Sequence, residues 1–192
     1  MVRDYSLEQG SAITFKLNNS TLSDNTDDRN KGAVFFESGG FGAEPLPNID
    51  VELNNNTIAN NDLYGLAAPL LGSLTLRHNI LADNGLRDCA LNLGQVLNGR
   101  HNIISRDTLC NYVPLPGDIV GVSPISIDLM LAPLADNGGG SWSRSLLPGS
   151  PAIDAGDPAG CGDTNRLFQW DQRGPGHPRH VATWDIGAFE VQ

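Results

Sequence analysis

The sequence is short of positive charge, with 12 Lys and Arg against 22 Asp and Glu and a net charge of −10. Binding to nucleic acid needs clustered Lys and Arg to neutralise phosphates, so no nucleic-acid partner is expected. The same deficit disfavours binding to an anionic membrane surface. No apolar run approaches the roughly 20 residues of a membrane-spanning helix, so the sequence predicts no membrane insertion.

Several enzyme motifs are also missing. The sequence has no Gly-x-Ser-x-Gly, no His-Glu-x-x-His, no Gly-x-x-x-x-Gly-Lys and no Gly-x-Gly-x-x-Gly. These motifs position a nucleophilic serine, a catalytic zinc ion or the phosphates of a nucleotide. No Cys-x-x-Cys pair supports a zinc site either. The corresponding enzyme classes are therefore disfavoured.

A long apolar pattern with the 3.6-residue period of a helix is missing as well, and a repeat takes its place. Similar segments of 11 residues begin at Phe15, Val51, Leu74 and Leu97, at offsets of 36, 23 and 23 residues. Apolar residues alternate at the start of each segment, which is the two-residue period of a strand. Asn, Gly, Ser and Asp, which are poor formers of helix interiors, crowd every unit.

This period is typical of folds in which each unit buries its apolar face by stacking on its neighbours. Strands at the same point of successive units would pair in parallel. The repeat therefore predicts an all-β fold, a parallel β-helix (solenoid) with an interior of Val, Leu and Ile.

Two columns of the aligned repeat are rich in asparagine. One column holds Asn56, Asn79 and Asn102, and the other holds Asn25, Asn61 and Asn84, followed by Asp107. Asparagine at a corner can bond to the asparagine of the next unit and to the backbone. Ordinary loop asparagines are the alternative, but the register with three apolar columns favours two structural ladders.

The repeat ends after residue 107, where the composition changes to Pro, Gly and Asp with short apolar segments. We expect residues 1–107 to form about four coils. Residues 108–192, here named the cap segment, are expected to close them as an irregular C-terminal cap. The longer first interval predicts an additional strand at 33–36. Because the repeat is under way by Ile13, further coils and an export signal are expected upstream.

The three cysteines allow one disulfide. Cys89 and Cys110 lie near one repeat period apart, so on neighbouring coils they would face each other and leave Cys161 unpaired. Three reduced thiols in a cytosolic protein are the alternative.

The cap segment contains four ordered motifs. They are Leu134-Ala-Asp-Asn-Gly-Gly139, Leu146-Leu-Pro-Gly-Ser-Pro-Ala-Ile-Asp-Ala-Gly-Asp157, Asp171-Gln-Arg-Gly174 and Asp185-Ile-Gly-Ala-Phe-Glu190. In order and spacing they resemble the C-terminal module of bacterial surface proteins called choice-of-anchor Q domain proteins. With the Asn-rich coils as the body, the resemblance covers the whole chain.

The resemblance implies a right-handed parallel β-helix, related in fold to pectate lyases, that is secreted or displayed on the cell surface. This chain departs from the family at Trp184, where relatives often carry a cysteine that can pair with the one equivalent to Cys161. The departure supports Cys89–Cys110 as the family-like disulfide.

Carboxylates of the cap segment are candidate calcium ligands, because calcium takes six to eight oxygen ligands from flexible loops. The candidates are Asp154, Asp157, Asp171 and Asp185, and no other cofactor is expected. Such aspartates also accept backbone N–H bonds in turns and pair with Arg173 and Arg179, which gives a structural alternative.

One pair of columns carries positive charge. Arg77 and His78 align with Arg100 and His101. Two stacked arginines on an acidic protein would contact an acidic sugar or, in a lyase, remove a proton. Solvated turn residues are the alternative.

Two functions follow. The leading hypothesis is a non-enzymatic secreted or cell-surface module, adhesin-like or structural in the envelope, with a polysaccharide or a host or cell-surface component as partner. The competing hypothesis is a carbohydrate-active enzyme, a polysaccharide lyase or glycoside hydrolase of the pectate-lyase-like superfamily. The aligned columns hold similar residues, whereas catalysis needs different polar groups that converge on one place. The columns therefore predict no catalytic site.

Overall fold

A computed structural model describes residues 12–26, 31–36, 48–68, 72–92, 96–160, 168–179 and 184–192. Within these ranges the regular secondary structure is all β and no helix is present, which confirms the predicted class. None of the described segments is a helix with the length and apolar character needed to cross a membrane.

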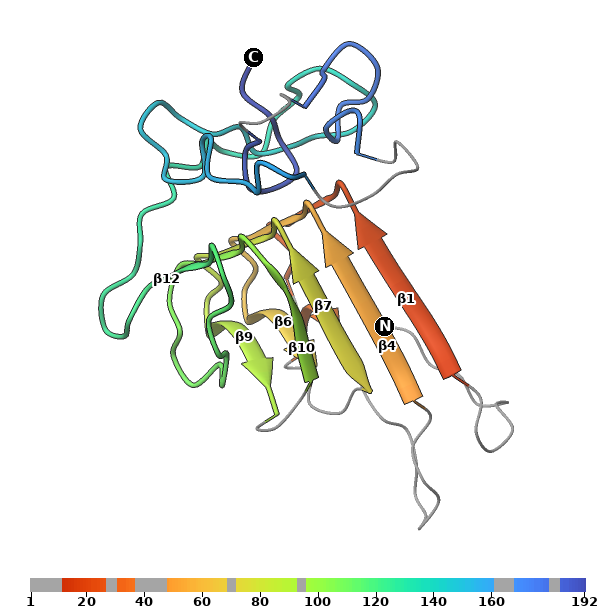
Figure 1. Cartoon of the computed structure of the whole chain (residues 1–192). Coiled ribbons are helices and arrows are strands. Elements are labelled where there is room, and N and C mark those ends of the chain that lie inside the picture. The colour runs from red at the N-terminus through yellow and green to blue at the C-terminus, as the bar shows by residue number, and fades with distance from the viewer. Residues whose placement is uncertain are drawn as a thin grey trace.

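Three sheets hold the strands of the described residues (Figure 1). Sheet A consists of β1 (Ala12–Asn18), β4 (Asn48–Asn54), β7 (Ser73–Arg77) and β10 (Val96–Arg100). Sheet B consists of β2 (Thr21–Ser23), β5 (Thr57–Ala59), β8 (Ile80–Ala82), β11 (Ile103–Ile104) and β12 (Ile119–Val120). Sheet C consists of β3 (Gly32–Phe35), β6 (Tyr64–Ala68) and β9 (Arg87–Leu91).

All strand pairs within these sheets are parallel, and the pairs formed between the aligned repeat segments keep the offsets of the sequence repeat. Phe15 pairs with Val51, Val51 with Leu74, and Leu74 with Leu97. The strand expected at 33–36 is β3, one residue out of phase. Strand β12 pairs with β11 beyond residue 107, so sheet B continues after the sequence repeat has ended.

The chain turns between sheets at residues with left-handed backbone. From sheet A to sheet B, here named the first corner, these are Asn19, Asn55, His78 and His101, with φ of 47, 54, 53 and 52°. From sheet B to sheet C, here named the second corner, they are Asp24, Asn60 and Asp83, with φ of 58, 58 and 54°. Asn, Asp and His are the non-glycine residues most enriched in this conformation, which explains the polar composition of the corners.

Except after Asn19, which Ser20 follows, the residue after each left-handed corner position belongs to one of the two predicted ladders, and both ladders are confirmed. At the first corner, the side-chain Nδ2 of Asn56 donates to Oδ1 of Asn79 at 3.0 Å, and Asn79 donates to Asn102 at 3.1 Å. At the second corner, Asn25 donates to Asn61 at 2.7 Å, and Asn61 donates to Asn84 at 2.8 Å.

Each ladder ends on an aspartate. The backbone N and Nδ2 of Asn102 donate to Asp118 Oδ1 at 2.7 and 3.1 Å. The same two groups of Asn84 donate to Asp88 Oδ1, both at 3.1 Å, so Asp88 rather than Asp107 follows Asn84. Within each ladder, the bonds between side chains run from one rung to the acceptor of the next rung toward the C-terminus. The last side chain therefore needs only to accept, and a carboxylate does so with charge-assisted bonds.

Cys89 and Cys110 form a disulfide with Cα atoms 4.9 Å apart, which confirms the predicted pairing. Both side chains are buried. The bond joins β9 to the segment that follows β11. Cys161, predicted to be unpaired, lies outside the described residues.

The three central strands of sheet B, β5, β8 and β11, are buried on both faces. Ile58, Leu81 and Ile104 face the interior shared with sheets A and C. Their neighbours in the sheet, Ile80 and Ile103, pack instead in a second cluster with residues of the cap segment: Leu129, Leu146, Ala152 and Ile186. The cap segment therefore covers the outer face of sheet B (Figure 1, teal to blue). Burial on both faces explains the consecutive apolar residues of these strands.

Candidate functional site

The histidines of the first corner lie under the cap segment. His78 and His101 stack with ring centroids 5.7 Å apart, and Trp184 lies 6.0 Å from His78. Nε2 of His78 accepts a hydrogen bond from the backbone N–H of Asp157 at 2.9 Å. Nδ1 of His101 donates to the carbonyl of Ala155, also at 2.9 Å. The two rings therefore bind the backbone of one cap turn.

The environment of His78 keeps its imidazole neutral. The side chain is fully buried, and burial lowers its pKa to about 3, with further lowering by the charges of His101 and Arg179. A ring nitrogen that accepts a backbone N–H bond must be unprotonated, so the geometry agrees with this direction.

Arg100 completes this arrangement by an ion pair with Asp157. Its Nε lies 2.6 Å from Asp157 Oδ2, and the Asp157 side chain is almost fully buried. Burial alone would raise the pKa of Asp157, but the N–H of Ala159 and the charge of Arg100 outweigh it, and the pKa is lowered. We name His78, His101, Arg100 and Asp157 the cap joint.

The four residues predicted to contact a saccharide do not share one accessible surface. His78 is inaccessible, and His101 is half-buried and bonded to the cap segment. Arg100 is exposed but paired with Asp157, while Arg77 is half-buried at the end of β7. The register does place Arg77 beside Arg100, as the alignment predicted.

Three of the four predicted calcium ligands, Asp157, Asp171 and Asp185, have side chains bonded to protein groups. Asp171 pairs with Arg173 at 2.6 Å. Asp185 accepts the N–H of Asp154 at 2.8 Å through Oδ1 and the N–H of Val191 at 2.6 Å through Oδ2. Asp154 itself is exposed. Across the described ranges, no three His, Cys, Asp or Glu side chains gather in a way that could hold a metal ion.

A buried ion pair that sequence reasoning did not locate lies nearby. Arg179 Nη1 is 3.2 Å from Glu190 Oε2, with both side chains fully buried. Arg179 Nη2 donates to Asn19 Oδ1 at 3.1 Å, which ties the cap segment to the first corner. The arginine was expected to pair with an aspartate, and its partner is a glutamate.

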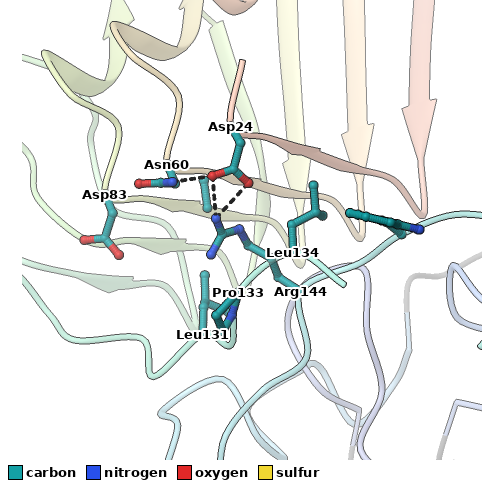
Figure 2. A pocket seen from close by; sticks show the side chains of 9 residues that line it. Asp24, Asn60, Asp83, Leu131, Pro133, Leu134 and Arg144 are labelled. Carbon is teal, nitrogen blue, oxygen red and sulfur yellow. Dashed lines mark hydrogen bonds and ion pairs between the residues drawn. The ribbon is translucent and has the colours of Figure 1, made fainter. Parts of the chain in front are cut away.

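The second corner faces an open pocket of about 580 Å³ (Figure 2). Its lining comes from the corner and from cap residues 131–144: Asp24, Ala59, Asn60, Asp83, Leu131, Pro133, Leu134, Trp142 and Arg144. In Figure 2, Arg144 reaches from the cap segment to Asp24, and Asp83 stands apart from this pair.

Arg144 is fully engaged in the wall of this pocket. Its Nη2 lies 2.8 Å from Asp24, its Nε donates to Ser23 Oγ at 2.5 Å, and its Nη1 donates to the carbonyl of Ala132 at 3.1 Å. Burial alone would raise the pKa of Asp24, but hydrogen bonds from Ser23, Asn60 and Arg144 outweigh it, and the pKa is lowered.

Sequence reasoning missed this pocket. Its corner residues were visible in the alignment, because Asp24, Asn60 and Asp83 directly precede the three asparagines of the second ladder. Trp142 and Arg144 carry no repeat signal, and their approach to the corner depends on the path of the cap segment. No protein-family model matches the chain, and neither curated proteins nor solved structures yield a match.

Proposed function

We propose that the chain is a right-handed parallel β-helix whose cap segment adds β12 to the last coil and then covers the outer face of sheet B instead of only closing the C-terminal end. The support is that strands β1 to β11 enter sheets A, B and C in turn and that each sheet is parallel. Crossover connections between parallel strands are right-handed in about 98% of cases. The proposal includes a relationship to choice-of-anchor Q domain proteins, which rests on the four sequence motifs of the cap segment.

We propose that the chain functions as a non-enzymatic secreted or cell-surface module. The cap joint carries this proposal, because its imidazole and carboxylate, the groups most suited to acid–base chemistry there, are both buried and bonded. The imidazole of His78 accepts the backbone N–H of Asp157, and the carboxylate of Asp157 pairs with Arg100. A general base must instead reach a substrate proton directly or through one water molecule.

The disulfide supports an oxidising compartment, since such bonds persist in secreted and surface proteins and are rare in the cytosol. For this reason we propose that the chain is exported from the cytosol.

The outer face of sheet A is the surface offered to a partner. Its register aligns Lys16, Glu52, Thr75 and Asn98 in one polar row across four strands. Flat rows of hydrogen-bonding groups suit an extended polysaccharide or a surface component of similar polarity, bound without chemical change.

The test is incubation of the oxidised protein with polygalacturonate, alginate and chondroitin, with and without calcium. We expect no unsaturated product by ultraviolet absorbance and no new reducing ends. Product formation that falls about 10²-fold or more in Arg77→Ala or Arg100→Ala would establish the lyase alternative instead. Arg87→Ala serves as the control, since it removes a positive charge from sheet C, away from both these arginines and the polar row of sheet A.

A further inference from the structure

The pocket at the second corner contains one carboxylate that has no ion pair within the described residues. Asp83 donates its backbone N–H to Ser105 Oγ at 3.3 Å, but no hydrogen bond or ion pair from the described residues reaches its side chain. The neighbouring Asp24 differs, because Arg144 already pairs with it. Asp83 is therefore the free anionic group of the pocket.

The surroundings of Asp83 are unfavourable for its negative charge. Asp83 is an exposed residue, but partial burial of its carboxyl raises its pKa, and the carboxylates of Asp88 and Asp128 raise the pKa further, while Arg144 and Arg106 act in the opposite direction. A cation entering the pocket would relieve this repulsion, because an opposite charge within a few ångströms favours the charged carboxylate. A neutral ligand would leave it in place.

The other lining groups suit an organic cation on an aliphatic stem. Trp142 is 62% exposed, and the face of an indole attracts ammonium and guanidinium groups. Leu131 and Pro133 form an apolar wall, of the kind on which the methylene groups of Lys and Arg pack. Calcium fits less well, since it takes six to eight oxygen ligands and no metal-binding group of three side chains exists in the described ranges.

We propose that this pocket binds a lysine or arginine side chain from a basic segment of a partner protein, with its charge on Asp83, its stem against Leu131 and Pro133, and Trp142 as the aromatic contact. The net charge of −10 would attract such a segment from a distance. This inference is independent of the proposed role of sheet A.

The test uses a fluorescein-labelled octalysine peptide and fluorescence anisotropy at low salt. Asp83→Asn should weaken binding about tenfold or more, the loss expected for a hydrogen bond to a charged group. Trp142→Ala should weaken it about threefold, in line with an exposed cation–π contact. The matched control is Asp62→Asn, which removes one charge from an exposed site outside the pocket lining and should change affinity less than about twofold.

Three results would overturn the proposal. One is the absence of octalysine binding by the wild-type protein. Another is an equal loss of affinity in Asp62→Asn and Asp83→Asn, which would mean that the peptide responds only to total charge. The third is binding of a neutral cello-oligosaccharide that depends on Trp142 but not on Asp83, which would make this a sugar pocket. Circular dichroism of each variant verifies that it is folded.

Discussion

The imidazole Nε2 of His78 accepts a hydrogen bond from the backbone N–H of Asp157 at 2.9 Å, across 79 residues of sequence. His78 turns the chain from sheet A to sheet B, while Asp157 belongs to the cap segment. Because Arg100 of the next coil holds the side chain of the same aspartate, two coils and the cap are fixed at one point.

The first prediction concerns the pH dependence of stability. The pKa of His78 is about 3 in the folded state and near 6.5 when unfolded. Below pH 6.5 the unfolded chain therefore binds more protons than the folded chain. The contribution of neutral His78 to the free energy of unfolding is complete above pH 6.5 and is lost as the pH falls toward 3. The slope from this residue reaches about 1.4 kcal/mol per pH unit.

His78→Asn tests this directly, because Asn19 and Asn55 adopt the same backbone conformation at the equivalent positions. Urea unfolding between pH 7 and 4.5 should show a shallower loss of stability in the variant. His177→Asn leaves His78 in place and should retain the wild-type slope. Equal slopes for wild type and His78→Asn would contradict the buried neutral imidazole.

A second prediction concerns the middle of the first ladder. Asn79 is fully buried, donates to the carbonyl of Leu53 at 2.7 Å and accepts from Asn56. Asn79→Ala should lower the free energy of unfolding by about 2–4 kcal/mol, since it leaves more than one buried group without a partner. The exposed Asn98→Ala in β10 should cost less than about 0.5 kcal/mol. Chemical denaturation measures both, and equal losses would refute the ladder's contribution.

A third prediction concerns the end of the second ladder. Asp88 accepts from Asn84 through Oδ1, and from Ser105 Oγ at 2.7 Å and the N–H of Arg106 at 2.9 Å through Oδ2. Asp88→Asn replaces one acceptor by an N–H donor that faces other donors, so thermal and urea unfolding should show a loss of about 2–3 kcal/mol. A loss no larger than that of the exposed Asp62→Asn would show that a neutral amide can end the ladder.

A fourth prediction concerns the disulfide. Cys89 and Cys110 close a loop with a sequence separation of 21 residues, which is worth about 3 kcal/mol in the chain-entropy model. The double variant Cys89→Ala, Cys110→Ala should lose about this much stability. In the unreduced protein, thiol titration after denaturation should find one reactive thiol, removed by Cys161→Ala. Three reactive thiols would mean that the cysteines are reduced in the isolated protein.

Stacking made the body of the fold predictable. Residues one repeat apart occupy the same environment on neighbouring strands, so Val51 above Leu74 and Asn56 above Asn79 could be read from the alignment alone. The same logic failed at the last rung, where Asp107 was expected after Asn84. Asp88, from the following strand of the same repeat, takes that position because it brings a carboxylate to the donors that Asn84 presents.

The cap contacts could not be predicted, for a related reason. Each one joins a repeat residue to a single non-repeating residue, as Arg144 joins Asp24 or Arg179 joins Asn19. Composition alone allowed both metal ligation and turn bonding for aspartates such as Asp185, with turn bonding the favoured alternative. The structure shows its oxygens accepting backbone N–H bonds, and burial raises its pKa.

The central claim is that Arg100 and Asp157 act as a structural joint, and a double-mutant cycle tests it most directly. Unfolding free energies of Arg100→Ala, Asp157→Ala and the double variant should give a coupling energy of about 1 kcal/mol or more, as expected for residues in one charged network. The exposed pair of Lys16 and Glu52, 2.9 Å apart, is the control and should couple by less than about 0.5 kcal/mol. Additivity of Arg100→Ala and Asp157→Ala within about 0.3 kcal/mol would contradict the account.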